Sequence, residues 1–227
     1  MGVMDLIQNA SMLDSMISTV LFDFGGVITT SPFDGFANYE KEAGLPEDLI
    51  RKINSTNPDM NAWAQYERNQ ITREEFLELF EEEAFALGYK VDAERVLQCL
   101  STDIRPKMLN AVQRLSDVYT TAILTNNLTE VSEDDTQPEP SREHLGSVMT
   151  VVDAIIESSK IGVRKPDAAF YEIACEQLGV RPDQCVFLDD LGINLKPAKL
   201  MGMTTIKVVN ESQALHDLSN VLNFDLS

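Results

Sequence analysis

The fold is decided by Leu21-Phe22-Asp23-Phe24-Gly25-Gly26-Val27-Ile28, a stretch near the N-terminus. The apolar run at 19–22 predicts a short buried strand, which ends at Asp23 just before a pair of glycines. An Asp close to glycine is also ordinary turn chemistry. In an open parallel sheet, however, ligands bind at the carboxyl ends of the strands. The role of Asp23 therefore depends on what other strands bring to the same edge.

The chain beyond residue 104 alternates between apolar runs and amphipathic segments. Further buried strands are predicted at 120–124, 151–156, 185–188 and 204–209, and helices at 107–115, 168–178, 194–201 and 212–222. Nearly continuous apolar strands separated by helices are typical of a parallel sheet covered on both faces. The sequence thus predicts an α/β fold, a Rossmann-like doubly wound parallel sheet. We assign residues 19–32 and 105–227 to this core.

Residues 33–104 contain no convincing strand. Apolar residues recur there at helical spacing, and Thr72 and Glu75 have the spacing of a capping box. We therefore predict a helical cap inserted between the first strand and the rest of the sheet. We interpret 1–18 as an N-terminal extension of unassigned role and 129–147, which is polar and acidic, as a flexible surface excursion.

The composition constrains the possible partners. The chain has 227 residues, of which 44% are hydrophobic, and this is enough for a sizeable core. Its 18 Lys and Arg against 37 Asp and Glu give a formal net charge of −19, which argues against nucleic acid and anionic membranes as partners. The same charge repels a phosphate at long range. An anion site must therefore be built locally from a cation, a metal or backbone N–H groups.

The cysteine content and the absence of long apolar runs indicate the compartment. The three cysteines are scattered, which is typical of a reducing compartment. Residues 1–18 contain no Lys or Arg, which argues against a secretory or transit peptide, and no apolar run approaches the ~20 residues that span a bilayer. We expect a soluble, cytoplasmic protein that is a monomer or a homodimer.

Polar residues follow three of the predicted strands, namely Asp23, Thr125-Asn126 and Asp189-Asp190, and Lys165 lies in a loop after a fourth. Each taken alone could be a cap, a turn or a solvated loop. In a parallel sheet, however, the carboxyl ends of the strands lie along one edge, so these residues can converge. Neighbouring carboxylates repel one another unless a cation lies among them, and a small set of oxygen ligands favours Mg²⁺.

This ordered pattern resembles the haloacid dehalogenase superfamily, whose phosphotransferase members carry an Asp nucleophile, a Thr or Ser, a Lys and an acidic pair in the same order. The resemblance runs from about residue 19 to the C-terminus. It is closest to the phosphatase-type N-terminal domain of soluble epoxide hydrolase and to the similar region of acyl-CoA dehydrogenase fusions. The segments that carry it are 121–126, 156–159, 165–167 and 186–196.

The resemblance implies a Mg²⁺-dependent phosphatase that acts on a small-molecule phosphate. Asp23 would attack phosphorus and form an aspartyl-phosphate. Thr125 and the backbone N–H of Asn126 would bind the oxygens of the transferred phosphoryl group. Lys165 would neutralise charge on the nucleophile and on the phosphate.

The resemblance also implies a metal site. The Asp23 carboxylate and the Gly25 carbonyl would ligate Mg²⁺ together with Asp190, the preferred ligand of the acidic pair. Asp189 would support Asp190 or share the ion. Asn194 lies where an acidic or amide residue holds a metal-bound water.

One position departs from the family pattern. Most phosphatases of the superfamily have a second Asp two residues after the nucleophile, as general acid and base, where this chain has Gly25. General acid–base help contributes about 10²–10⁴-fold. Three interpretations stay open: a leaving group that needs little protonation, such as an acyl or anomeric phosphate; a proton from a cap residue or water; or a weakly active or silent binding and regulatory module.

The 2-haloacid dehalogenases of the same superfamily are an alternative, because they also use a lone Asp. They need no metal, so the acidic pair Asp189-Asp190 favours phosphoryl chemistry instead. In the cap, Trp63 and Tyr66, with Glu67 and Arg68 beside them, could line a substrate entrance. Single cap aromatics are more typical of core packing, and we leave these residues out of the predicted site.

Overall fold

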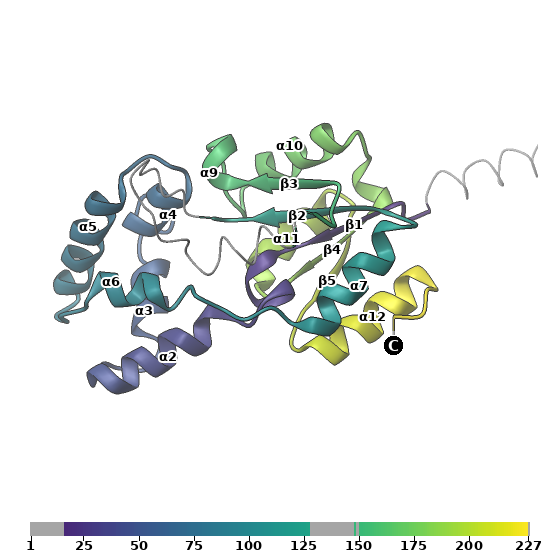
Figure 1. The fold of residues 1–227 in the computed structure, drawn as a ribbon. Helices are drawn as coiled ribbons and strands as arrows, with labels where there is room; N and C mark the ends of the chain where they lie inside the picture. The colour runs from purple at the N-terminus through teal and green to yellow at the C-terminus, as the bar shows by residue number, and fades with distance from the viewer. Residues whose placement is uncertain (1–15, 128–147, 149, 227) are drawn as a thin grey trace, which may run out of the picture.

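The computed structural model describes residues 16–127, 148 and 150–226. The predicted surface excursion and nearly all of the predicted N-terminal extension lie outside these residues. The described part of the chain forms a five-stranded parallel sheet in the order β3-β2-β1-β4-β5 (Figure 1). Its strands are β1 (Thr19–Phe22), β2 (Thr120–Thr125), β3 (Ala154–Glu157), β4 (Cys185–Asp189) and β5 (Thr204–Lys207). The predicted fold class is confirmed, although β3 begins three residues later than the sequence predicts.

The register of the sheet brings the predicted site residues to one edge. Phe22 at the end of the central strand β1 is aligned with Ile123 of β2 and with Leu188 of β4. The residues that follow these three positions therefore leave the sheet side by side. Because all pairs are parallel, every strand ends at the same edge.

Helices cover both faces of the sheet, as a doubly wound fold requires. The buried side chains of Val20 and Phe22 belong to the cluster under α7 (Pro106–Ser116) and α12 (Glu211–Leu222). Leu21 points to the opposite face, because side chains alternate along a strand. It belongs to the cluster under α10 (Ala168–Leu178) and α11 (Gly192–Leu200).

The helical insert lies between β1 and β2, beyond the carboxyl ends of the strands (Figure 1). Its helices are α2 (Pro32–Ala43), α3 (Leu49–Ser55), α4 (Ala62–Glu67), α5 (Arg73–Ala86) and α6 (Ala93–Gln98). They enclose a hydrophobic cluster of their own, which includes Phe36, Tyr66, Phe76 and Phe80. The predicted capping box of Thr72 and Glu75 is present at the start of α5. Helix α4 was not predicted as a separate helix, although its residues lie in the stretch predicted to be helical.

Three short elements complete the described fold. The chain turns after β1 through η1 (Phe24–Ile28), and η2 (Pro182–Gln184) precedes β4. The loop predicted after β3 begins with one helical turn, α9 (Ser158–Ile161). Among the residues that the structure describes, no helix combines the length and the apolar composition needed to cross a bilayer.

Candidate active site

Hydrogen bonds with backbone groups of Leu188 and Phe24 hold Asp23 at the end of the central strand. Its N–H donates to the carbonyl oxygen of Leu188 (2.8 Å), and its carboxylate Oδ1 accepts from the N–H of Phe24 (2.7 Å). The chain then turns at Gly26, whose φ of 76° lies in the left-handed region. A Cβ at Gly26 would lie 2.3 Å from Asp190 Oδ2, so glycine is needed there to bring Asp190 beside the turn that follows Asp23.

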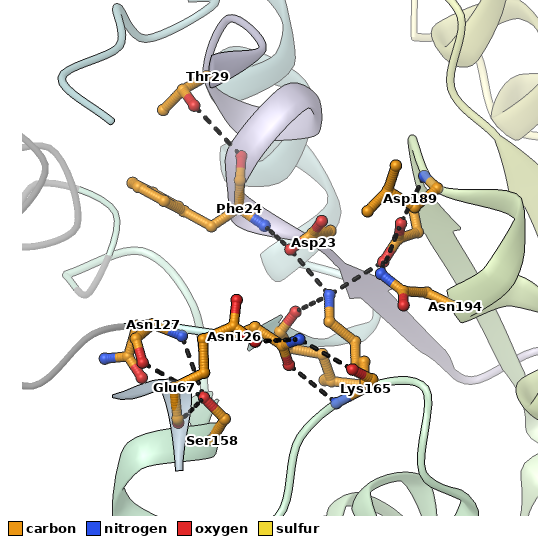
Figure 2. Close-up of polar contacts among 12 residues, drawn as sticks. Asp23, Phe24, Thr29, Glu67, Asn126, Asn127, Ser158, Lys165, Asp189 and Asn194 are labelled. Atoms are coloured by element: carbon orange, nitrogen blue, oxygen red, sulfur yellow. Dashed lines mark hydrogen bonds and ion pairs between the residues drawn. The ribbon is translucent and has the colours of Figure 1, made fainter. Parts of the chain in front are cut away.

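Lys165 joins two of the strand ends (Figure 2). Its ammonium lies 2.8 Å from Asp23 Oδ1 and 2.9 Å from Asp189 Oδ2, and it donates to the carbonyl oxygen of Leu124 at 2.7 Å. The Asn126 side chain fixes its backbone: Oδ1 accepts from the Lys165 N–H (2.8 Å), and Nδ2 donates to the Lys165 carbonyl (2.9 Å). The three N–H groups of the ammonium therefore have three acceptors, in a side chain that is 1% exposed.

The neighbouring carboxylates of the acidic pair have different environments. Asp189 is fully buried, and Lys165, the N–H of Leu191 (2.7 Å) and the Asn194 amide engage both of its oxygens. Asp190 is only partly buried and accepts a long hydrogen bond, 3.4 Å, from Ser31 Oγ. Asp189 is thus bonded within the core, whereas Asp190 presents its carboxylate to the open space in front of the sheet.

Burial and charge shift the pKa values at this edge. Burial raises the pKa of Asp23 well above its usual range; the Lys165 ammonium opposes this, and Asp189 and Asp190 add to it. Burial, reinforced by Asp189, raises the pKa of Asp190 to about 6. Desolvation lowers the pKa of Lys165, but Asp189 and Asp23 outweigh it, so the pKa lies above its usual value and the group stays cationic.

The donor set fits a divalent cation. One carboxylate oxygen from each of Asp23, Asp189 and Asp190 lies within 4.8 Å of the others. When all three carboxylates are ionised, the single ammonium of Lys165 leaves two negative charges uncompensated, and a divalent ion would balance them. Carboxylate and carbonyl oxygens are hard ligands, of the kind that Mg²⁺ prefers.

A cavity of about 850 Å³ opens in front of this edge. Its floor is formed by core residues, which include Asp23, Gly25, Thr125, Asn126, Lys165, Asp190 and Asn194. The insert lines the cavity with apolar side chains, namely Phe33, Phe36, Trp63 and Leu100. Three arginines also line it: Arg51, Arg68 and Arg164. The structure therefore brings all predicted site residues to one place, with Asp189 buried behind the floor.

The side-chain amide of Asn194, a residue of the cavity floor, contacts Asp189. Its Nδ2 donates to both oxygens of that carboxylate, at 3.2 and 3.0 Å, and its carbonyl accepts from Tyr171 Oη at 2.6 Å. These bonds fix the first turn of α11 against β4. The predicted role of Asn194 toward a metal-bound water stays a prediction, whereas its support of Asp189 is visible.

Glu67, the last residue of α4, is the site residue that the sequence interpretation left out. It is 7% exposed; its carboxylate accepts from Trp63 Nε1 (2.9 Å) and Asn126 Nδ2 (3.2 Å) and forms an ion pair with Arg164 Nε (2.5 Å). Its carbonyl accepts from Ser158 Oγ at 2.7 Å. The spacing of Trp63 and Glu67, four residues apart, was the available signal, but it names no partner in the core.

The two aromatic residues of α4 differ in their surroundings. Tyr66 is buried and stacks on Phe76, with ring centroids 4.8 Å apart, which matches the expected core packing. Trp63 packs edge-on against Phe36, Phe76 and Phe80. It also lines the cavity, so one face of the insert's hydrophobic cluster is the cavity wall.

Comparison with known proteins identifies the family. A family model described as haloacid dehalogenase-like hydrolase matches residues 17–202. The chain belongs to this family. Acyl-CoA dehydrogenase family member 10 of Mus musculus is 30% identical over 91% of this hydrolase. Bifunctional epoxide hydrolase 2 of the same organism is 28% identical over 88% of it. The chain spans only 19% and 38% of the length of these two relatives.

Two further similarities cover nearly the whole of the matched proteins. The phosphatase MT3486 of Mycobacterium tuberculosis is 29% identical to the hydrolase over 90% of this chain and 95% of its own. A haloacid dehalogenase family enzyme of Bacteroides thetaiotaomicron was solved in complex with magnesium and inorganic phosphate. It superposes with a TM-score of 0.58 and 20% identity, over 84% of this chain and 93% of its own. At that identity, this second likeness shows the fold alone.

Proposed function

We propose that this hydrolase is a Mg²⁺-dependent phosphatase that acts on a small-molecule phosphate through an aspartyl-phosphate on Asp23. The observation that carries the proposal is the position of the Asp23 carboxylate at the cavity floor, 2.8 Å from the Lys165 ammonium and next to Asp190. Similarity to a mycobacterial phosphatase over almost the full chain supports it, as does the magnesium and phosphate bound by a protein of the same fold.

The contacts of Asp23 separate the tasks of its two oxygens. The Phe24 N–H and Lys165 both contact Oδ1, so we assign attack on phosphorus to Oδ2. Lys165 holds the carboxylate in place and balances its charge. Thr125 and the N–H of Asn126, at the end of β2, would bind the equatorial phosphoryl oxygens, and preorganised donors of this kind stabilise charge that develops in the transition state.

The metal would be held by the Asp23 carboxylate, the Gly25 carbonyl and Asp190. When bound, Mg²⁺ would neutralise negative charge on the phosphate and orient it toward the nucleophile. We assign Asp189 a supporting role, because Lys165, Leu191 and Asn194 already engage its oxygens. We further propose that residues 33–104 act as a cap that selects the substrate through the cavity wall.

Two other functions make different demands on this site. A metal-independent dehalogenase would leave two negative charges uncompensated among Asp23, Asp189 and Asp190, which argues against it. A module that binds without turnover is favoured by one observation, the missing side chain at Gly25. The intact contacts between Asp23, Lys165 and Asp189 favour an active enzyme over such a module.

Phosphate release from p-nitrophenyl phosphate tests the proposal, measured with Mg²⁺ and after its removal by EDTA. We expect turnover that requires the metal and falls by about 10⁴-fold or more in Asp23→Asn, because removing a nucleophile abolishes the covalent route. Asp117→Asn is the matched control: the same change at an exposed residue just after α7 should have no effect.

The contrary outcomes point to the other functions. Turnover that persists in Asp23→Asn would refute the aspartyl-phosphate route. Release of chloride from 2-chloropropionate without metal would indicate a dehalogenase. If no phosphate is released from acetyl, aryl or alkyl phosphates at any Mg²⁺ concentration, the chain is a binding module.

A further inference from the structure

The described residues that form the cavity floor hold no acid that is free to protonate a leaving group. No His, Tyr or Cys is among the described residues that line the cavity. The Lys165 ammonium already donates to Asp23, Asp189 and the Leu124 carbonyl. The remaining candidates are the carboxyl groups that line it, namely Asp23, Asp59, Glu67, Asp167 and Asp190.

Each of these carboxyl groups belongs to the proposed site, is already engaged in other contacts, or is exposed in a loop. Asp23 and Asp190 belong to the proposed nucleophile and metal site. Glu67 is in an ion pair with Arg164 and accepts two further hydrogen bonds, so both of its oxygens are already engaged. Asp167 Oδ1 caps α10 by accepting from the Ala169 N–H at 3.0 Å, and Asp59 is exposed in the loop before α4.

Position 25 has room for a side chain that could donate a proton, but glycine has none. Gly25 lines the cavity two residues after Asp23, with φ −67° and ψ 130°, a conformation open to any residue. A Cβ built there would meet only Pro32 Cδ, at an ordinary contact distance of 3.9 Å. This contrasts with Gly26, where a Cβ would collide with Asp190. Packing therefore does not require glycine at position 25.

We propose that the enzyme acts on phosphates whose leaving group departs as a stable anion: acyl, enol or aryl phosphates rather than alkyl phosphates. The inference rests on the proposed phosphatase function. In the step, an Asp23 oxygen forms a bond to phosphorus, and the bond from phosphorus to the leaving oxygen breaks. That oxygen keeps the electron pair and leaves as an anion. A carboxylate then stays ionised, whereas an enolate or a phenolate takes its proton later from water.

The pKa of the leaving group then decides the rate. It is about 4 for a carboxylic acid and about 10 for a phenol, whereas that of an alkyl alcohol is far higher and close to that of water. A general acid at the site would reduce most of the difference in rate between these substrates, because it accelerates the departure of a poor leaving group by about 10²–10⁴-fold. Without such an acid, the dependence on leaving-group pKa is steep.

The decisive measurement is kcat/KM of the full chain with Mg²⁺ for acetyl, p-nitrophenyl, phenyl and benzyl phosphate. Phenyl and benzyl phosphate carry the same ring, but only benzyl phosphate has an alkyl leaving group. We expect kcat/KM to fall along this series, with phenyl exceeding benzyl phosphate by about 10²-fold or more. Because kcat/KM reports only the steps up to departure of the leaving group, slow hydrolysis of the aspartyl-phosphate does not affect it.

Gly25→Asp places an acid where the cavity has room for one. We expect it to raise kcat/KM for benzyl phosphate about tenfold or more, and that for p-nitrophenyl phosphate much less. Gly25→Asn, which has the same size and no acidic proton, should give no such gain. If thermal unfolding shows that neither variant folds, the wild-type series alone decides.

The two proposals fail in different ways. Wild-type enzyme that hydrolyses benzyl and phenyl phosphate with equal kcat/KM, by a route that Asp23→Asn abolishes, overturns this inference and leaves the phosphatase function standing. An equal gain from Gly25→Asp and Gly25→Asn for benzyl phosphate also overturns it. Failure to turn over any phosphate of the series removes the phosphatase function itself.

Discussion

The floor and the wall of the cavity are built in opposite ways. At the floor, the Lys165 ammonium lies within about 3 Å of carboxylates from two distant parts of the chain, Asp23 on the floor and Asp189 behind it. On the wall, aromatic side chains of the insert, such as Trp63 and Phe36, pack edge-on at 6.0 Å between ring centroids. The floor depends on the fixed register of the sheet, whereas the wall depends on apolar packing that tolerates substitution.

The difference suggests a division of labour. Under the proposed function, catalysis requires fixed positions and would occur at the strand ends, where neighbouring strands hold each residue. Substrate selection would then belong to the insert, which has a hydrophobic cluster of its own. Glu67 is the described residue whose carboxylate joins both regions, through Trp63 on one side and Asn126 and Arg164 on the other.

The largest effect is expected on the floor, from Lys165→Met. The change leaves Asp23 and Asp189 buried without their partner, which costs about 3–5 kcal/mol in the free energy of unfolding. It also removes an electrostatic group worth about 10²–10³-fold in turnover. Urea unfolding and phosphatase assays measure both. Lys107→Met, at an exposed lysine of α7, is the control and should alter neither. Full stability and turnover in Lys165→Met would show that the floor does not depend on this contact.

An intermediate effect is expected where floor and wall meet, from Glu67→Gln. Glutamine has a single acceptor oxygen, so it cannot serve Trp63, Asn126 and Arg164 together. Because Asn126 holds the backbone of Lys165, we expect kcat to fall by about fivefold to tenfold, with a smaller change in KM. Steady-state kinetics with p-nitrophenyl phosphate measure the change, and Glu67→Asp, which keeps the charge, should recover part of it. Glu78→Gln, on the exposed side of α5, is the control. Equal kinetics for the Glu67→Gln and Glu78→Gln variants would contradict a link between the two regions.

The smallest effect is expected on the wall, from Phe33→Ala. The Phe33 ring packs against Phe36 at 5.9 Å and lies under the Arg51 guanidinium at 4.4 Å, where it lines the cavity. Losing this partly buried apolar surface should raise KM for aryl phosphates by about threefold to tenfold and lower kcat less. Phe85→Ala, at a residue that is 78% exposed on α5, should leave KM as it is. A fall in kcat larger than the rise in KM would show that Phe33 acts on catalysis, as the floor residues do, rather than on substrate binding.

Much of the floor could be predicted because the information is local. Each strand shows as an apolar run, and each run is followed by its polar residue, as at Asp23 and Thr125. Parallel pairing then forces these ends together, because the register leaves them no other edge. The capping box at Thr72 and the gap in the family pattern at Gly25 are likewise visible in a few consecutive residues.

The amino-acid sequence by itself thus determined the α/β sheet, the position of the helical insert and the residues that meet at the sheet edge. Only the tertiary structure decided that Asp189 is bonded within the core while Asp190 faces the cavity, that Asn194 supports Asp189, and that Glu67 joins insert and core. The physical reason is that periodicity shows which face of an element is buried. The atoms that this face meets depend on how distant segments pack, and no local pattern contains that information.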